Sequence, residues 1–216
     1  MRKAKEPFQF VAASYLIRIC RERAKTLGEL ESHLRSVPDG SIFYHTFQSL
    51  ESHHYTAFSS DFAQWVMAAC NEAVLAERLA TLDLREFVSL VDLREVLVRR
   101  VADHLSQNPQ SAERPAFETF HFCEAVEVAV PLDARAYDLS ELAGGVRHLS
   151  LQTLHHHFIN SRLRLGLRTN DFSNWIDCSL GLPELAARLN RIDFYNNSLE
   201  GLREQVLRTL EGWKNQ

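Results

Sequence analysis

The chain has 216 residues, of which 45% are hydrophobic, and a formal net charge of -4. This composition supplies enough apolar material for a core, and the mildly acidic balance speaks against general nucleic-acid binding, which needs a concentrated basic surface. No stretch reaches the roughly 18 uncharged apolar residues that a membrane-spanning helix requires. The four cysteines are scattered without a close pair, so we expect reduced thiols in a cytoplasmic protein that does not enter a membrane.

The first predicted element is a strand over residues 8–20, where aromatic and β-branched side chains are frequent. Its counterpart is residues 120–131, in which every second position from Val126 to Val130 is valine, a period of two that suits a half-buried strand. Alignment of the two halves at their FxF motifs places Phe8 on Phe120. Both halves of the chain are therefore predicted to open with a strand.

A helix is predicted after each strand, capped by Thr26 in the first half and by Asp138 in the second, with leucines at helical spacing behind each cap. The next helix is predicted from Ser41 to about Tyr55, with Phe43 pointing inward. The two halves differ most in this region. The neutral residues 51–58 of the first half correspond to an arginine-rich segment at residues 161–168.

Further helices are predicted to begin after the polar pairs 59–60 and 169–170, because both pairs precede an aspartate and an apolar helical pattern. The pattern breaks at Gly181 and Pro183, and the equivalent break in the first half falls at Asn71. Ser89 and Ser198 are predicted to cap the last helix of each half.

The repeat is clearest within residues 41–94, which match residues 151–204 without a gap. The first-half residues that recur are His45, Asp61, Phe62, Trp65, Leu75, Ala76, Arg78, Leu79 and Asp83. We therefore predict a mainly α (α+β) fold of two homologous units, each with one strand and about five short helices. A pseudo-two-fold axis and a small antiparallel β ribbon are expected to relate the units. The predicted units are residues 1–107 and residues 118–216, joined by a linker at residues 108–117. A single merged globule is the alternative.

Motifs along almost the whole chain resemble those of an uncharacterised prokaryotic family, domain of unknown function 5752, present here as a tandem copy. The resemblance is carried by SIFYH, DFAQW and LAERL in the first half, and by FHF, NDFSNW and SLEGLR in the second. It departs from the family pattern at Ser60, where asparagine is more usual before the aspartate. The resemblance implies genomic association with carbohydrate-active proteins such as glycosyltransferases, and it carries no established activity.

Repeated polar residues provide the candidate catalytic groups: His45 with Asp61, and His155 with Asp171. An imidazole and a carboxylate in each unit, with neighbouring histidines, suggest a two-His-one-carboxylate metal site that activates water. The spacing matches no known ligand motif, and a histidine that donates to a first-turn aspartate would hold two helices together without chemistry. The structural interpretation is favoured, so no metal site and no cofactor are assigned.

Arg162, Arg164 and Arg168, together with His156, occur in the second half alone and form a candidate ligand-binding cluster. The alternative for this cluster is a solvated helix end. Trp65 and its repeat are expected in the core rather than on a sugar-stacking surface. The repeated arginines, Arg78 among them, are expected to pair internally with Asp83 or its repeat.

Motifs for acyl transfer, nucleotide-dependent phosphoryl transfer and dinucleotide redox chemistry are absent from the sequence. The leading hypothesis is a non-catalytic module that binds a protein or a small molecule and regulates carbohydrate metabolism, the last part resting on family association. The alternatives are a metal-dependent hydrolase that uses the His/Asp pairs and a sugar-phosphate binder that uses the arginine cluster. A homodimer is a further possibility, and nucleic acid is not an expected partner.

Overall fold

A computed structural model describes residues 3–48, 58, 60–194 and 197–214. It contains a two-stranded antiparallel sheet formed by β1 (Phe8–Ala24) and β2 (Phe120–Ala136), each 17 residues long. Both strands extend beyond the predicted bounds, because pairing with each other satisfies the backbone groups of residues whose own sequence is not strand-like. The fold is α+β and mainly helical within the described ranges.

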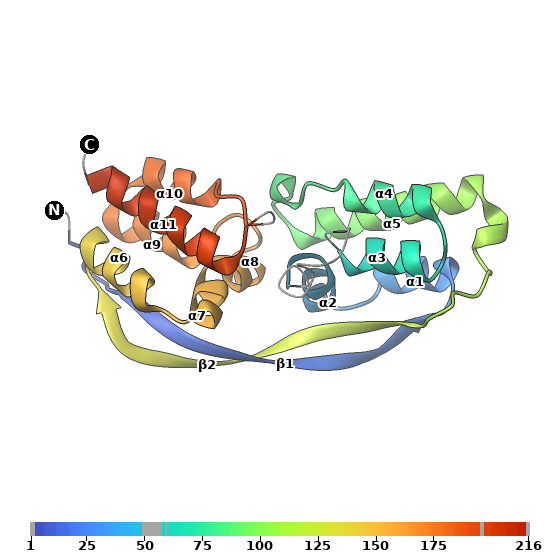
Figure 1. Ribbon diagram of the computed structural model, residues 1–216, viewed down its shortest axis with the longest axis horizontal. Helices are drawn as coiled ribbons and strands as arrows, with labels where there is room; N and C mark the ends of the chain where they lie inside the picture. The colour runs from blue at the N-terminus through green and yellow to red at the C-terminus, as the bar shows by residue number, and fades with distance from the viewer. Residues whose placement is uncertain (1–2, 49–57, 59, 195–196, 215–216) are drawn as a thin grey trace. The chain divides into compact units, whose positions relative to one another are not determined.

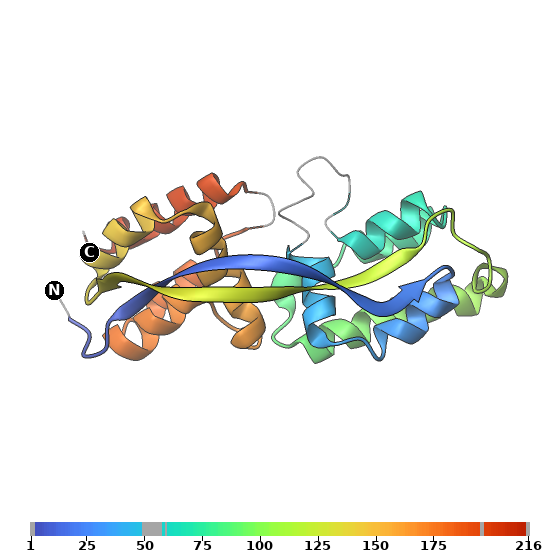
Figure 2. The same ribbon diagram turned by 90° about the horizontal axis from the view of Figure 1, so that it is seen from below.

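The chain divides into two compact units. Unit 1 comprises residues 1–15 and 127–216, and unit 2 comprises residues 16–126. Each unit therefore contains part of both strands and the helices of one half of the sequence. In each unit the helices lie on one side of its strands (Figures 1 and 2). The predicted bounds at residues 107 and 118 separate the two halves of the sequence. Each compact unit instead contains one end of the strand that belongs to the other half.

Unit 2 contains helices that follow β1 in the chain. They are α1 (Leu27–Leu34), α2 (Asp39–Phe43), the π-helical turn η1 (Tyr44–Gln48), α3 (Asp61–Ala68), α4 (Ala73–Ala80), the short 3-10 turn η3 (Leu84–Glu86), α5 (Leu90–Gln107) and the 3-10 turn η4 (Pro109–Ser111). The later part of the helix predicted from Ser41 to about Tyr55 falls on residues 49–57, outside the described residues.

Unit 1 contains helices that follow β2. They are α6 (Leu139–His148), α7 (Leu151–His155), the π-helical turn η5 (His156–Asn160), α8 (Ser161–Arg164), α9 (Asp171–Leu180), α10 (Pro183–Asn190) and α11 (Leu199–Lys214).

The predicted helix caps are confirmed. Thr26 Oγ1 accepts a hydrogen bond from the backbone N–H of Glu29 at 3.1 Å, and the Glu29 carboxylate accepts from the N–H of Lys25, the residue before the cap. Ser60 and Asn170 cap α3 and α9 in the same way. These short polar side chains satisfy amide groups that the first helical turn leaves unpaired.

The predicted helix breaks are also confirmed. Asn71 has φ 56° and Gly181 has φ 63°, both in the left-handed region that ends a helix. Pro183 then occupies the first turn of α10, where its missing N–H costs nothing.

The aromatic FxF motifs form the centre of each core, and each packs on helices encoded by the other half of the sequence. In unit 1, Phe8 of β1 lies 5.2 Å from Phe172 and 5.8 Å from Trp175, measured between ring centroids. In unit 2, Phe120 of β2 lies 5.3 Å from Phe62. Each set of helices therefore packs against a strand that the other half of the sequence supplies.

Candidate functional site

His45 and, in the second half, His157 lie on π-helical turns that continue α2 and α7, whereas His155 is the last residue of α7 itself. A π-turn inserts one extra residue into a helix and changes the direction of the side chains after it. In unit 2 this turn places His45, which is 3% exposed, between the N-terminus of α3 and the strand β2. His157 has the equivalent place in unit 1, between α9 and β1.

His45 joins a strand to a helix through both ring nitrogens. Its Nδ1 lies 2.7 Å from Oδ2 of Asp61, the first residue of α3, and its Nε2 accepts a hydrogen bond of 2.8 Å from the backbone N–H of Cys123. A backbone amide always donates, so Nε2 carries the lone pair and Nδ1 carries the proton that is donated to Asp61. We call this arrangement of strand N–H, imidazole and carboxylate a histidine bridge.

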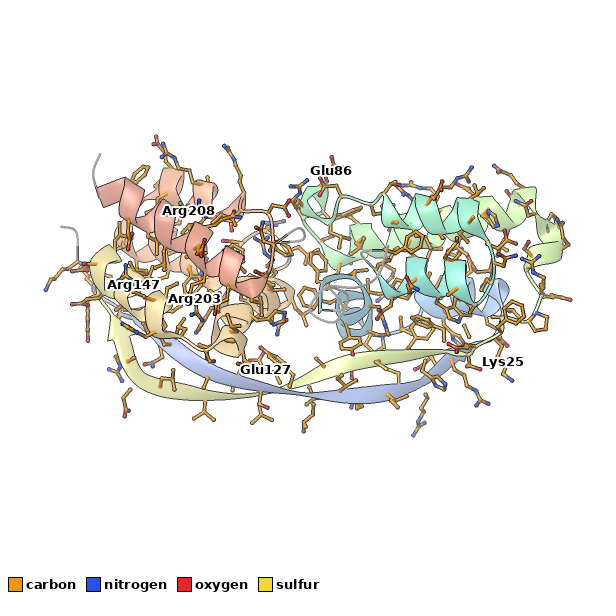
Figure 3. All side chains as sticks on the ribbon, in the orientation of Figure 1. Lys25, Glu86, Glu127, Arg147, Arg203 and Arg208 are labelled. Carbon is orange, nitrogen blue, oxygen red and sulfur yellow. The ribbon has the colours of Figure 1, made fainter. Side chains whose placement is uncertain are left out.

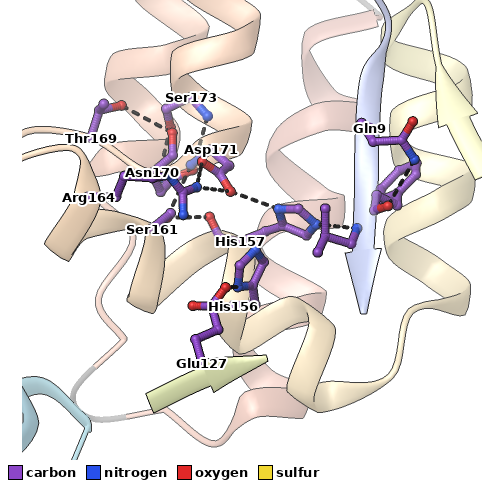
Figure 4. Close-up of polar contacts among 12 residues, drawn as sticks. Gln9, Glu127, His156, His157, Ser161, Arg164, Thr169, Asn170, Asp171 and Ser173 are labelled. Carbon is purple, nitrogen blue, oxygen red and sulfur yellow. Dashed lines mark hydrogen bonds and ion pairs between the residues drawn. The ribbon is translucent and has the colours of Figure 1, made fainter. Parts of the chain in front are cut away.

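Unit 1 contains a second histidine bridge. Nδ1 of His157 lies 2.9 Å from Oδ2 of Asp171, and Nε2 accepts a hydrogen bond of 3.0 Å from the backbone N–H of Val11 (Figure 4). The partner of Asp171 is thus His157 and not His155, the residue that the gap-free repeat predicts. The physical reason is a difference in connector length. The bridging histidine and its aspartate are 16 positions apart in unit 2 and 14 positions apart in unit 1.

Unit 1 has an open pocket of about 400 Å³ beside its histidine bridge. Its lining includes the polar side chains of Glu127, His156, Arg164 and Asp171, with Trp175 on the apolar side. Arg164 donates to both carboxylate oxygens of Asp171 at 2.7 and 3.0 Å. The pocket is therefore lined by one guanidinium, two carboxylates and the imidazoles of His156 and His157 (Figure 4).

Burial of the Asp171 carboxyl raises its pKa, but the hydrogen bond from His157 and the charge of Arg164 outweigh burial, and the net pKa lies below the usual value. Asp171 is accordingly ionised at neutral pH. His156 contacts a carboxylate of its own, because its Nδ1 lies 3.0 Å from Oε1 of Glu127. Unit 2 has Tyr44 at the position that precedes its bridging histidine, so this second carboxylate–imidazole pair has no counterpart among the residues of unit 2 that the structure describes.

Comparison with known proteins gives one family and one solved structure. Residues 5–211 match the model of DUF5752, described as a family of unknown function. The chain belongs to this family. It is also similar to a structure titled "The structure of OrfY from Thermoproteus tenax", with 31% sequence identity, a TM-score of 0.86 and coverage of 99% of this chain and 98% of that chain. No curated protein matches at a significant level.

The arginines of this DUF5752 chain that were predicted to form one cluster lie in different environments. Arg162 is buried, donates from Nε to the backbone oxygen of Phe158 at 3.3 Å, and stacks over the ring of Phe194. Arg164 reaches the pocket and Arg168 is exposed away from its lining. Of the predicted ligand-binding residues, the structure brings His156 and Arg164 together in the pocket.

The repeated tryptophans lie in the core, whereas the repeated aspartate and arginine side chains form polar contacts. The indole N–H groups of Trp65 and Trp175 donate to backbone oxygens at 2.8 and 3.0 Å, and both rings are buried, as expected for core residues. Asp83 pairs with Arg85 at 2.7 Å, so its predicted pairing with Arg78 is wrong. Arg203 donates to the backbone oxygen of Leu149 at the end of α6 (Figure 3).

Ligand atoms of His156, His157 and Asp171 lie within 4.8 Å of one another, the residue types of a two-His-one-carboxylate metal site. The hydrogen bonding of His157 does not fit this use. A metal at Nδ1 would require the proton on Nε2, where it would face the N–H of Val11, donor against donor. The residues therefore fit a hydrogen-bonded bridge rather than a metal site.

In the described part of the chain, no helix is both long and apolar enough to cross a membrane.

Removal of either histidine bridge is expected to lower stability while leaving the aromatic packing in place. His45→Phe and His157→Phe each delete two hydrogen bonds and leave a strand N–H unpaired, and we expect a loss of about 2–4 kcal/mol in the free energy of unfolding. His121→Phe and His148→Phe, at exposed positions, are matched controls that should stay within about 0.5 kcal/mol of the wild type. Urea denaturation measures all four. A bridge variant as stable as its control would show that the bridges carry no stability.

Proposed function

We propose that this protein is a non-catalytic ligand-binding module and that the pocket of unit 1 is its binding site. The observation that carries the proposal is the difference between the two units. Unit 2 has Tyr44 beside its bridging His45, whereas unit 1 has His156 in that place, and Glu127 and Arg164 line the pocket beside it. The hydrogen bonds of the unit 1 bridge use neither His156 nor Glu127, so a different role explains the presence of these two residues.

The charges of the pocket favour a polar ligand without a phosphate. One guanidinium, already bonded to Asp171, faces the carboxylates of Asp171 and Glu127, so a dianion would meet net negative charge. The sugar-phosphate alternative also loses Arg162, which is buried in the core. The proposal also includes a role in regulating carbohydrate metabolism, a cytoplasmic location and a pseudo-two-fold relation between the repeats.

Binding is tested by thermal unfolding in the presence of uncharged and phosphorylated mono- and disaccharides. A ligand that binds only the folded state at 100 times its Kd should add about 2.7 kcal/mol to the free energy of unfolding. We expect a shift with an uncharged compound and its loss in His156→Tyr, which copies the residue of unit 2. His148→Tyr, outside the pocket, should keep the shift. An equal shift in both variants would move the binding site elsewhere, and the absence of any shift would contradict the proposal.

A protein-binding role is a second candidate, supported by exposed aliphatic residues on the strands. In unit 2, Leu16, Ile17 and Ile19 of β1 are 63–67% exposed. Exposed β-branched residues on a strand are a common feature of contacts between chains. The homodimer form of this candidate is tested by sedimentation, in which a monomer at every concentration would remove it.

A further inference from the structure

His156 differs from the other histidine in the pocket in the use of its ring nitrogens. Nδ1 of His156 faces Oε1 of Glu127 at 3.0 Å and the hydroxyl of Tyr15 at 3.1 Å. Its Nε2 forms no hydrogen bond with any residue that the structure describes, and this atom is not sealed from solvent although the ring is only 3% exposed. The pocket is the open space that the ring lines.

Both ring nitrogens of the neighbouring His157 are already hydrogen-bonded, Nδ1 to Asp171 and Nε2 to the backbone N–H of Val11. The two imidazoles thus form two carboxylate pairs side by side. Both ring nitrogens of His157 have hydrogen-bond partners within the fold. In His156 only Nδ1, which faces Glu127, has such partners among the described residues. In a histidine oriented through Nδ1 by a carboxylate, Nε2 is the atom that carries the lone pair.

We propose that His156 is the hydrogen-bond acceptor of the pocket: Nε2 accepts a hydrogen bond from a hydroxyl or amine of the ligand, and Glu127 is the positioning residue that fixes the ring. This inference rests on the proposed function and specifies the chemistry of that same site. It assigns to the pocket a ligand that presents an uncharged or cationic hydrogen-bond donor. Ligand binding should accordingly weaken when His156 is protonated.

The surroundings of His156 favour its neutral form. The titratable and charged groups that face it are Glu127 of β2, Tyr15 of β1, the adjacent His155 and His157, Arg164 of α8 and Asp171 of α9. Burial lowers the pKa of His156, the neighbouring His157 lowers it further, and Glu127 and Asp171 offset part of this effect. The lone pair on Nε2 is therefore available at neutral pH.

The test uses diethyl pyrocarbonate on the full chain at pH 7, with the modified histidines located by mass spectrometry. A neutral imidazole nitrogen attacks a carbonyl carbon of this reagent and forms an N–C bond, and the displaced half leaves as carbon dioxide and ethanol. Among the three consecutive histidines we expect modification at His156, while His155 and His157 stay protected until the protein unfolds. Glu127→Gln should slow the reaction of His156 by about tenfold, because the carboxylate that orients the ring is lost.

The outcomes separate this inference from the proposed function. Reaction of His156 that a saccharide from the binding experiment blocks supports both. Reaction at His156 that no tested compound blocks supports Nε2 as a hydrogen-bond acceptor and counts against the proposed ligand class. Protection of His156 in the ligand-free protein, or an unchanged rate in Glu127→Gln, overturns the inference. The exposed His121 and His148 give the reference rate in every sample.

Discussion

Replacement of Gly145 by alanine is expected to destabilise unit 1 by about 2–3 kcal/mol. A Cβ atom at Gly145 of α6 would overlap the ring of Phe10, which is 1% exposed, so the buried ring would have to shift. Gly144, one residue earlier in the same helix, has open space at its Cβ position. Gly144→Ala should therefore stabilise the helix by up to about 1 kcal/mol, so the two neighbouring substitutions are expected to act in opposite directions.

Equilibrium unfolding in urea measures both glycine variants, and a second substitution identifies the cause. Phe10→Leu removes the ring atoms that the new Cβ would meet, so Gly145→Ala should cost less in that background than in the wild type. Additive losses in the double variant would show that the close approach of Phe10 to Gly145 does not exist. Similar effects of the two single variants would point to helix propensity alone.

Acidification is expected to destabilise the protein through His155. This histidine is 2% exposed, and burial, followed by the neighbouring His156, lowers its pKa from 6.5 to about 4. The unfolded chain takes up the proton near pH 6.5, whereas the folded chain resists it until about pH 4. The contribution of His155 to stability is therefore complete above pH 6.5 and is lost as the pH falls toward 4, a change of about 3 kcal/mol.

The matched variant for this effect is His155→Phe, because unit 2 has the fully buried Phe43 at the corresponding position when the two halves are aligned at their FxF motifs. The free energy of unfolding of this variant should fall less steeply than that of the wild type between pH 6.5 and pH 4. His148→Phe, at an exposed position, should keep the wild-type slope. Equal slopes for His155→Phe and the wild type would mean that His155 titrates normally in the folded protein.

The histidine that pairs with Asp171 shows how much of the candidate site could be predicted from the sequence. The alignment that superimposes the FxF motifs also places His45 on His157, so the signal for the correct partner of Asp171 was present. The gap-free match of residues 41–94 with residues 151–204 pointed to His155 instead. Spacing alone could not decide between three consecutive histidines, because the π-helical turn sets which ring faces the aspartate and which faces the core.

The sequence by itself determined the caps and breaks of the helices and the presence of the two strands. Thr26, Ser60, Asn71 and Gly181 act on groups within a few residues along the chain, and such local preferences can be read directly. Only the tertiary structure decided that each FxF motif packs on helices of the other half, that Arg162 is buried and that Glu127 meets His156. These contacts join residues far apart in the chain, and their energies depend on burial and on hydrogen-bond partners that no local pattern encodes.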